Sequence, residues 1–304
     1  MIRLIGIALL SLCLAAQAHA QGAKKTIAFA QDNMANDFRR AQVFEVRDAV
    51  AKNPELAFVS SDAVGQTSLL IRQIEQFIDQ KVSVLVLGTN DESAVVPAVA
   101  KAYRAGIPVI VLDRGIKGRD YTTFINSDNV KIGTIGAQYI AKALKGKGTV
   151  LLFEGLQAAD VTQMRTKGFL DEIGRHPGIK VVRRTGNYLR KDAVVEMEKL
   201  VADGIRVDAI FSESDSMLSG VRVVLEKHRI DPRGIVMVGC DYTSEAREAI
   251  RQGTQAGSVL FPLGGTQTVD LARRILAGEK VPKHISIPIK LVTKENVEQV
   301  PPIF

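Results

Sequence analysis

Short runs of apolar, often β-branched residues alternate along the chain with longer segments in which apolar residues recur every three or four positions. The short runs predict strands buried on both faces, and the longer segments predict amphipathic helices. In the segment 66–80, for example, Leu70, Ile74 and Phe77 would share one helical face. The predicted strands lie at 26–30, 56–60, 82–88, 107–112, 148–153, 179–184, 207–212, 235–239 and 256–261.

The order of these elements predicts an α/β protein with two domains. Four strand–helix units precede the segment 123–130, and a second series begins with the predicted strand at 148–153. Two successive doubly wound, Rossmann-like domains with parallel sheets fit this count, with the division near 123–130. The last predicted helix, 266–278, is followed by an extended segment at 284–292.

The first twenty residues predict a secretory signal peptide. Arg3 precedes an apolar run from Leu4 to about Ala16, and the small residues Ala18 and Ala20 predict cleavage after Ala20. The run is shorter than a membrane span, and no other segment approaches the roughly 18 apolar residues that a span needs. We therefore expect a soluble protein that is exported from the cytoplasm.

Charge and cysteine content narrow the possible functions. The sequence has 40 Lys and Arg against 33 Asp and Glu, and its net charge of +7 becomes +6 once Arg3 is removed with the signal peptide. Basic residues are dispersed among acidic ones, so we expect no nucleic-acid binding. Cys240 is the only cysteine after residue 20, which excludes an internal disulfide in the mature chain. A lone cysteine at a strand end is more typical of a packing residue than of a nucleophile.

Catalytic and metal-binding signatures are missing from the sequence. It contains neither a Walker phosphate-binding loop nor a G-x-S-x-G nucleophile elbow, and His176, His228 and His284 lack metal-ligand spacing. Glu213 and Asp215 could act in acid–base catalysis, but their position before a predicted helix favours a capping role. We expect no enzymatic activity, no cofactor and no metal.

Five predicted strands end in polar clusters, which read AFAQDN, VLDRG, LLFEG, IFSESDS and MVGCDYT. Ligands of open parallel sheets bind beyond the carboxyl ends of the strands, so these clusters predict a ligand-binding cleft. Carboxylates and guanidinium groups suit a polyhydroxylated ligand, because Asp accepts hydrogen bonds from hydroxyls and Arg donates to their oxygens. An aromatic ring would cover the C–H face of such a ligand.

With these features the chain resembles the type I periplasmic sugar-binding proteins of ABC importers, the ribose- and galactofuranose-binding group. The resemblance covers residues 25–293, and its landmarks are IPVIVLDRG (107–115), FINSDNVKIG (124–133), MRTKGF (164–169), SESDSMLSG (212–220), VMVGCDY (236–242) and LAGEKVP (276–282). It implies two lobes joined by a three-segment hinge, with crossings near Ser127, Phe261 and Pro288. The N-terminal lobe would comprise 24–126 plus 262–288, and the C-terminal lobe 127–261 plus 289–304.

The resemblance also implies which residues contact a ligand held between the lobes, which close over it by hinge motion. Carried over position by position, these contacts are Asn36, Phe38, Asp113, Arg114, Ser127, Leu156, Arg165, Tyr188, Ser214, Asp241 and Phe261.

Several of these positions depart from the ribose-binding pattern. Arg39 replaces a second Phe, which resembles the galactofuranose- and arabinose-binding branch and adds Arg39 to the implied contacts. Cys240 stands where the ribose-binding pattern has another Phe, Ser214 stands where it has an Asn, and Phe261 stands where it has a Gln. With Arg39, the implied site carries one more guanidinium group than carboxylates, so a furanose, a polyol or an acidic sugar would suit it better than ribose.

The resemblance implies a monomeric periplasmic solute-binding protein that captures a monosaccharide or polyol and delivers it to an ABC permease in the inner membrane. A sensory protein of the same fold, which presents a sugar or signal molecule to a membrane receptor or kinase, stays open as an alternative. A sugar-responsive transcription factor would need a DNA-binding headpiece where this sequence has its predicted signal peptide.

Overall fold

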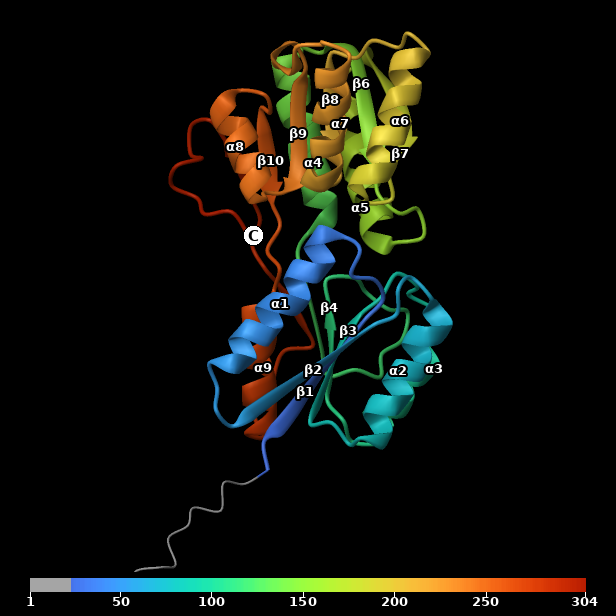
Figure 1. The fold of residues 1–304 in the computed structure, drawn as a ribbon, viewed down its shortest axis with the longest axis vertical. Helices are drawn as coiled ribbons and strands as arrows, with labels where there is room; N and C mark the ends of the chain where they lie inside the picture. The colour runs from blue at the N-terminus through green and yellow to red at the C-terminus, as the bar shows by residue number, and fades with distance from the viewer. Residues whose placement is uncertain (1–22) are drawn as a thin grey trace, which may run out of the picture.

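Two α/β lobes lie one above the other along the long axis of the molecule (Figure 1). The computed structural model describes residues 23–304, so the predicted signal peptide and its cleavage site lie outside the described residues. Within 23–304 no helix is both long and apolar enough to cross a membrane.

The N-terminal lobe is built on a six-stranded parallel sheet in the order β11-β5-β4-β3-β1-β2. Its strands are β1 (Lys25–Gln31), β2 (Leu56–Asp62), β3 (Val84–Gly88), β4 (Val109–Leu112), β5 (Thr123–Asn126) and β11 (His284–Ser286). Two helices pack together on each face of the sheet. They are α1 (Asp37–Ala51) with α9 (Gly265–Leu276), and α2 (Thr67–Asp79) with α3 (Val96–Arg104).

The C-terminal lobe repeats this plan in the order β12-β10-β9-β8-β6-β7, and only β12 runs antiparallel to its neighbour in the described sheet. Its strands are β6 (Lys147–Glu154), β7 (Gly178–Thr185), β8 (Ala209–Ser212), β9 (Val236–Asp241), β10 (Gly257–Leu260) and β12 (Lys290–Thr293). Its helices are α4 (Asn129–Ala143), α5 (Asp160–Ile173), α6 (Arg190–Ala202), α7 (Asp215–Lys227) and α8 (Ser244–Gln252). The pairs α4–α5 and α6–α7 cover opposite faces.

The burial of the strands follows from this layered arrangement. Every residue of β3, β4 and β8 is buried, because helices cover both faces of each parallel sheet. The predicted α/β class and all nine predicted strands are confirmed, with ends that differ by a few residues. The strands β5, β11 and β12 were not predicted individually, because runs of three or four residues carry too little apolar pattern.

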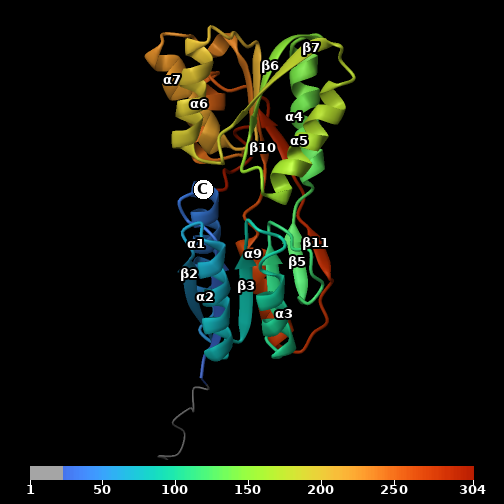
Figure 2. The same cartoon turned by 90° about the vertical axis from the view of Figure 1, so that its right-hand side faces the viewer.

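The chain passes between the two sheets three times (Figure 2). These connections join β5 to α4, β10 to α9 and β11 to β12, and they contain residues 127, 261 and 288. Each sheet therefore receives an edge strand from the last part of the chain. The residue boundaries given above for the lobes stay a prediction.

Candidate ligand-binding site

A cavity of about 270 Å³ lies between the two lobes. It is lined by Asn36, Phe38, Asp113, Arg114, Val161, Arg165, Tyr188, Ser214, Asp241 and Phe261. Nine of these ten residues were predicted as contacts, and the exception is Val161, an aliphatic residue whose sequence context gives no polar signal.

Three predicted contacts do not line this cavity. Leu156 is half-buried and packs against the core of the C-terminal lobe. Ser127 is buried at the crossing between lobes, and its Oγ has no hydrogen-bond partner within residues 23–304. Arg39 is 2% exposed and lies beside Asp113, with its Nη1 3.3 Å from Asp113 Oδ2. Arg39 therefore acts on the cavity through Asp113.

On the N-terminal lobe, Asp113 and Arg114 line the cavity and are backed by Arg39 and Asp32, which do not line it. We call these four charged side chains the N-lobe wall. Asp113 and Arg114 reach the cavity because β4 ends in a sharp turn. Asp113 has a φ of 71°, and its N–H donates to Ile125 O at 2.7 Å. A left-handed backbone costs about 1–3 kcal/mol, and Asp is among the residues that tolerate it best.

Several polar atoms of the N-lobe wall are buried without partners. Within residues 23–304 no hydrogen bond reaches Asp113 Oδ1, Arg114 Nε or either carboxylate oxygen of Asp32. Buried polar atoms are nearly always hydrogen-bonded in folded proteins, so this wall offers donors and acceptors for a polar ligand. Asp32 was not named as a contact, although it stands in the polar cluster after the first predicted strand.

The C-terminal lobe contributes Arg165, Tyr188, Ser214 and Asp241, which we call the C-lobe wall. Arg165 is fixed in place by its own lobe. Its Nε donates to Asn129 Oδ1 at 2.8 Å and its Nη1 to Glu213 O at 2.7 Å. The guanidinium also lies 4.7 Å from the centre of the Phe261 ring, within the range of a cation–π interaction.

Close packing of α4 and α5 supports the position of Arg165. A Cβ atom on Gly133 of α4 would lie 2.0 Å from Arg165 O, and one on Gly168 of α5 would lie 2.0 Å from Val130 O. The two helix backbones therefore touch, which only glycine permits at these two positions. Both glycines stand in landmark segments of the resemblance, FINSDNVKIG and MRTKGF.

The other members of the C-lobe wall are also positioned by local structure. The Tyr188 hydroxyl lies 2.7 Å from Thr162 Oγ1 and donates to Glu213 Oε2 at 3.3 Å. Ser214 caps α7 by accepting from Met217 N at 3.2 Å. Asp241 is the last residue of β9 and has a φ of 105°. Tyr188, with a φ of 61°, and Asp113 are the other left-handed residues in the cavity lining.

The capping role expected for Glu213 and Asp215 falls to Ser214, because Glu213 precedes the cap of α7 and Asp215 is the first residue of the helix. Asp215 accepts from Tyr242 N at 2.7 Å and from Ser258 Oγ at 2.5 Å, and therefore anchors the backbone next to Asp241. Cys240 is fully buried and burial raises the pKa of its thiol, which suits a packing residue and not a nucleophile.

Burial disfavours the charged form of a side chain, so it raises the pKa of the buried acids of the site and lowers the pKa of one buried arginine. Burial raises the pKa of Asp241, and it raises the pKa of Glu213 to about 7. Burial lowers the pKa of Arg114, and the nearby positive charge of Arg39 adds to this effect. Burial also opposes the charge of Arg165, but surrounding acidic groups outweigh it and raise the pKa of Arg165.

The lobes contact each other around the cavity. Asn36 Nδ2 donates to Tyr188 O at 2.7 Å, and Gly115 N donates to Asp160 Oδ2 at 2.9 Å. The Phe38 ring stacks on Phe261 with 5.2 Å between ring centres. The two lobes therefore touch around the cavity.

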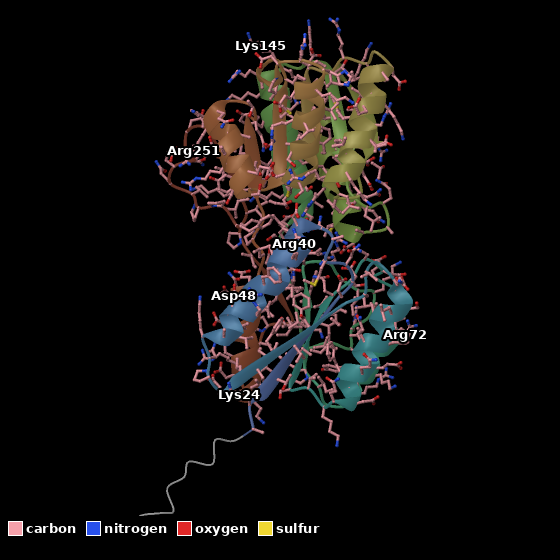
Figure 3. All side chains as sticks on the ribbon, viewed as in Figure 1. Lys24, Arg40, Asp48, Arg72, Lys145 and Arg251 are labelled. Carbon is pink, nitrogen blue, oxygen red and sulfur yellow. The ribbon has the colours of Figure 1, made fainter. Side chains whose placement is uncertain are left out.

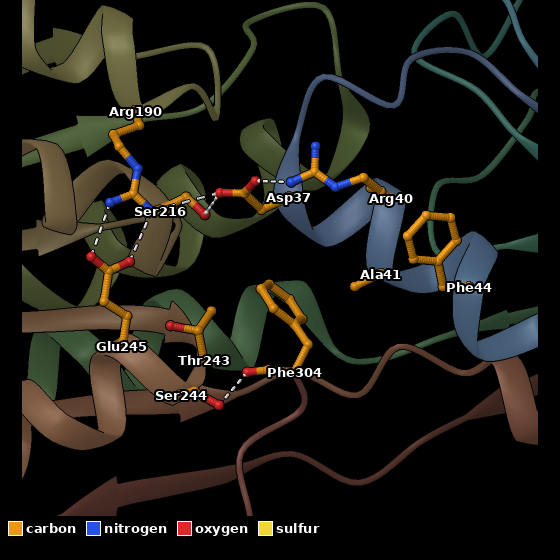
Figure 4. A pocket seen from close by; sticks show the side chains of 10 residues that line it. All are labelled: Asp37, Arg40, Ala41, Phe44, Arg190, Ser216, Thr243, Ser244, Glu245 and Phe304. Carbon is orange, nitrogen blue, oxygen red and sulfur yellow. Dashed lines mark hydrogen bonds and ion pairs between the residues drawn. The ribbon is translucent and has the colours of Figure 1, made fainter. Parts of the chain in front are cut away.

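A larger hollow of about 850 Å³ also lies at the lobe boundary, between α1 and the first turns of α6, α7 and α8 (Figure 4). Its charges are already paired, because Arg190 makes two hydrogen bonds to Glu245 and Arg40 donates to Asp37. Arg40 is exposed on the surface (Figure 3). No buried unpartnered polar atom of the described chain belongs to this hollow, so the smaller cavity is the better candidate site.

Residues 23–304 contain no cluster of three or more His, Cys, Asp or Glu side chains arranged to hold a metal ion.

Comparison with known proteins adds independent information. A family model described as a periplasmic binding protein domain matches residues 27–280. The ribose import binding protein of Bacillus subtilis is 31% identical over 248 residues, which cover 81% of this chain and 80% of that protein.

Two solved structures are also similar. A solute-binding protein of an ABC transporter from Bacillus halodurans, with bound myo-inositol, has a TM-score of 0.85 and 28% identity, and the match covers 91% of this chain and 97% of the other. The fructose-binding periplasmic domain of a hybrid two-component system has a TM-score of 0.83 and 25% identity, with 90% and 92% of the two chains covered.

Proposed function

The chain belongs to the periplasmic binding protein domain family, and from this membership we propose that it captures a monosaccharide or polyol and delivers it to the permease of an ABC importer. The relatives and structural neighbours are solute-binding proteins, and the chain is accordingly a binding protein and not an enzyme. The observation that carries the proposal is the convergence of charged residues from both lobes, Asp113 and Arg114 opposite Arg165 and Asp241, on one buried cavity.

The chemistry of the cavity suits a ligand with several hydroxyl groups. Asp113 Oδ1 can accept from a ligand hydroxyl, and Arg114 Nε can donate to an oxygen, since both are buried without partners in the described chain. The rings of Phe38, Tyr188 and Phe261 line the same space and can cover the apolar face of a sugar ring. A furanose, a pyranose and a cyclic polyol all present such a combination of hydroxyls and C–H groups.

The proposed mechanism is a shift in an equilibrium between open and closed lobes. A ligand that bonds to both walls gains its full set of contacts only in the closed form, so binding stabilises closure. The closed form would then be the one recognised by the permease. This role places the protein in the periplasm as a monomer, after cleavage behind Ala20.

A sensory role is the second candidate, because one close structural neighbour is a periplasmic domain of a two-component system. In that role the closed form would be recognised by a membrane receptor or kinase instead of a permease.

A thermal-shift screen of the mature protein against pentoses, hexoses, inositols, linear polyols and sugar acids tests the binding function. A true ligand should raise the melting temperature as its concentration increases, because it binds only the folded state. Absence of any shift across the screen would contradict the proposal.

Uptake of the identified ligand, labelled with carbon-14, by cells that lack the gene separates the two roles. Loss of uptake supports transport. Normal uptake combined with loss of a transcriptional response to the ligand supports sensing.

A further inference from the structure

Asp32 is a buried carboxylate at the end of β1 that no predicted contact includes. The residue is 4% exposed, and its backbone N–H donates to Gly88 O at 3.1 Å. Neither side-chain oxygen of Asp32 has a hydrogen-bond partner within residues 23–304. Arg39 Nε lies 3.9 Å from Asp32 Oδ1, which is an ion pair but too long for a hydrogen bond.

Arg39 connects Asp32 to the cavity. Its Nη1 lies 3.3 Å from Asp113 Oδ2, and its Nη2 donates to Thr89 O at 3.2 Å, directly after β3. Negative, positive and negative charges therefore follow one another along the carboxyl ends of β1, β3 and β4. Arg39 Nε is itself buried and has no hydrogen-bond partner in the described chain, so this row of charges is not saturated by the protein.

Asp32 changes the formal charge of the site. Without Asp32, the formal charges of the site would sum to +1, as they do for the residues implied by the sequence. A site of net positive charge would favour an anionic ligand. With Asp32, three guanidinium groups stand against three carboxylates and their formal charges cancel. The members are Arg39, Arg114 and Arg165 against Asp32, Asp113 and Asp241.

The other ionisable groups near the site do not make its net charge positive. Asp160 stands at the rim, where its Oδ2 accepts from Gly115 N, and Glu213 lies behind Arg165. Both are acidic, so any charge they carry is negative.

We propose that Asp32 is a specificity-determining residue, which makes the site select an uncharged polyhydroxylated ligand over the corresponding sugar acid. This inference rests on the proposed function. Repulsion between Asp32 and a ligand carboxylate weighs more in this buried site than it would in water. Asp32 does not line the cavity, so the hydroxyl groups of an uncharged ligand would reach its unpartnered oxygens through an ordered water.

The Asp32→Asn variant tests the proposal, since it removes one negative charge and keeps the shape of the side chain. Titration calorimetry at low ionic strength would measure wild type and variant with two pairs of probes, D-ribose with D-ribonate and D-galactose with D-galacturonate. We expect the affinity for the acid, relative to its uncharged partner, to rise at least about tenfold in the variant. An unchanged ratio would overturn the proposal.

Two further variants separate charge from shape and from general effects. Asp32→Glu keeps the charge and should keep the preference for the uncharged sugar, even if its overall affinity falls. Asp62→Asn is the matched control, because Asp62 ends the adjacent strand β2 and already accepts from Met34 N and Val64 N. It should leave the ratio unchanged.

The outcomes distinguish this inference from the proposed function. If wild type prefers the acid, the role assigned to Asp32 is wrong while the binding function stands. If wild type binds no sugar, polyol or sugar acid in the thermal-shift screen, the proposed function fails and the role of Asp32 fails with it.

Discussion

Arg114 and Arg165 are both buried guanidinium groups in the same cavity, but the two lobes hold them differently. Arg165 in the C-lobe wall donates to Asn129 Oδ1 and Glu213 O, and its pKa is raised. Arg114 in the N-lobe wall makes no side-chain hydrogen bond within residues 23–304, and its pKa is lowered by burial. The C-lobe wall is thus organised before a ligand arrives, whereas the N-lobe wall has groups left to satisfy.

This difference suggests a division of roles. A group that is already fixed loses little entropy on binding and contributes mainly to affinity. Unpartnered groups discriminate among ligands, because a ligand that fails to satisfy them leaves them buried and unbonded. We therefore expect changes in the C-lobe wall to affect both folding and binding, and changes in the N-lobe wall to affect mainly binding.

The largest effect should come from Arg165→Ala, which removes the central group of the C-lobe wall. We expect binding to weaken about a hundredfold or more, and the free energy of unfolding to fall by about 2–4 kcal/mol, because two buried acceptors lose a charged donor. Calorimetric titration and urea denaturation measure the two quantities. Lys167→Ala, an exposed change on α5, is the control, and an affinity for Arg165→Ala equal to wild type would contradict the assignment.

Glu213, which lies behind the C-lobe wall, should contribute to the pH dependence of stability together with Asp215 and Asp241, because burial raises the pKa of all three carboxyl groups. The Glu213 pKa of about 7 in the folded protein exceeds the ordinary value of 4.5, so folding favours the protonated form. The stabilisation by this group is complete below about pH 4.5 and is lost as the pH rises through about 7, by up to about 3 kcal/mol.

The Glu213→Gln variant checks this effect, because glutamine resembles the protonated acid. Urea denaturation between pH 5 and 8 should give a shallower pH dependence for Glu213→Gln than for wild type. Parallel curves would show that Glu213 does not contribute to the pH dependence. Glu226→Gln, at an exposed position of α7, should retain the wild-type curve.

The Asp113→Asn variant tests the expectation that changes in the N-lobe wall affect mainly binding. We expect binding to weaken at least about tenfold, while the free energy of unfolding falls by less than for Arg165→Ala. The reason is that Asp113 Oδ1 has no partner in the described chain, and that asparagine keeps an oxygen to face Arg39 Nη1, which lies 3.3 Å from Asp113 Oδ2 in the wild type. Asparagine is chosen over alanine since it tolerates the left-handed backbone at this position. A stability loss as large as that of Arg165→Ala would remove the distinction between the two walls. The exposed change Asp48→Asn serves as the control.

The smallest effect should come from Asp160→Ala, which removes the hydrogen bond from Gly115 N across the lobe boundary. One such bond contributes about 1 kcal/mol, so ligand affinity should fall about fivefold as the closed form becomes less favourable. Titration calorimetry compares it with Asp171→Ala, an exposed change on the same helix. Equal affinities of the two variants would mean that this contact does not stabilise closure.

The sequence predicts the two-lobe fold well, because its strands are buried on both faces and therefore form continuous apolar runs. Asp113 and Arg114 could be assigned to the cleft for the same reason, since they follow such a run directly. The edge strands β11 and β12 could not be predicted in this way, because each is a short segment whose partner strand lies far away in the sequence.

The supporting residues of the site were harder to predict. Arg39 and Arg40 are adjacent in one helical turn, yet Arg39 is 2% exposed and the Arg40 side chain 46%. Helical periodicity alone does not predict whether Arg39 or Arg40 lies against Asp113. Asn129 accepts from Arg165 and donates to Ser127 O, and its contact with Arg165 depends on the close approach of α4 to α5.

The backbone contact between α4 and α5 at Gly133 and Gly168 has a consequence for redesign of the protein as a sensor. A helix spacing set by backbone atoms cannot be adjusted gradually by larger or smaller side chains, so Arg165 is a fixed reference point. Engineered changes of ligand preference therefore belong at Asp32 and at the end of β4, which lie outside the helices.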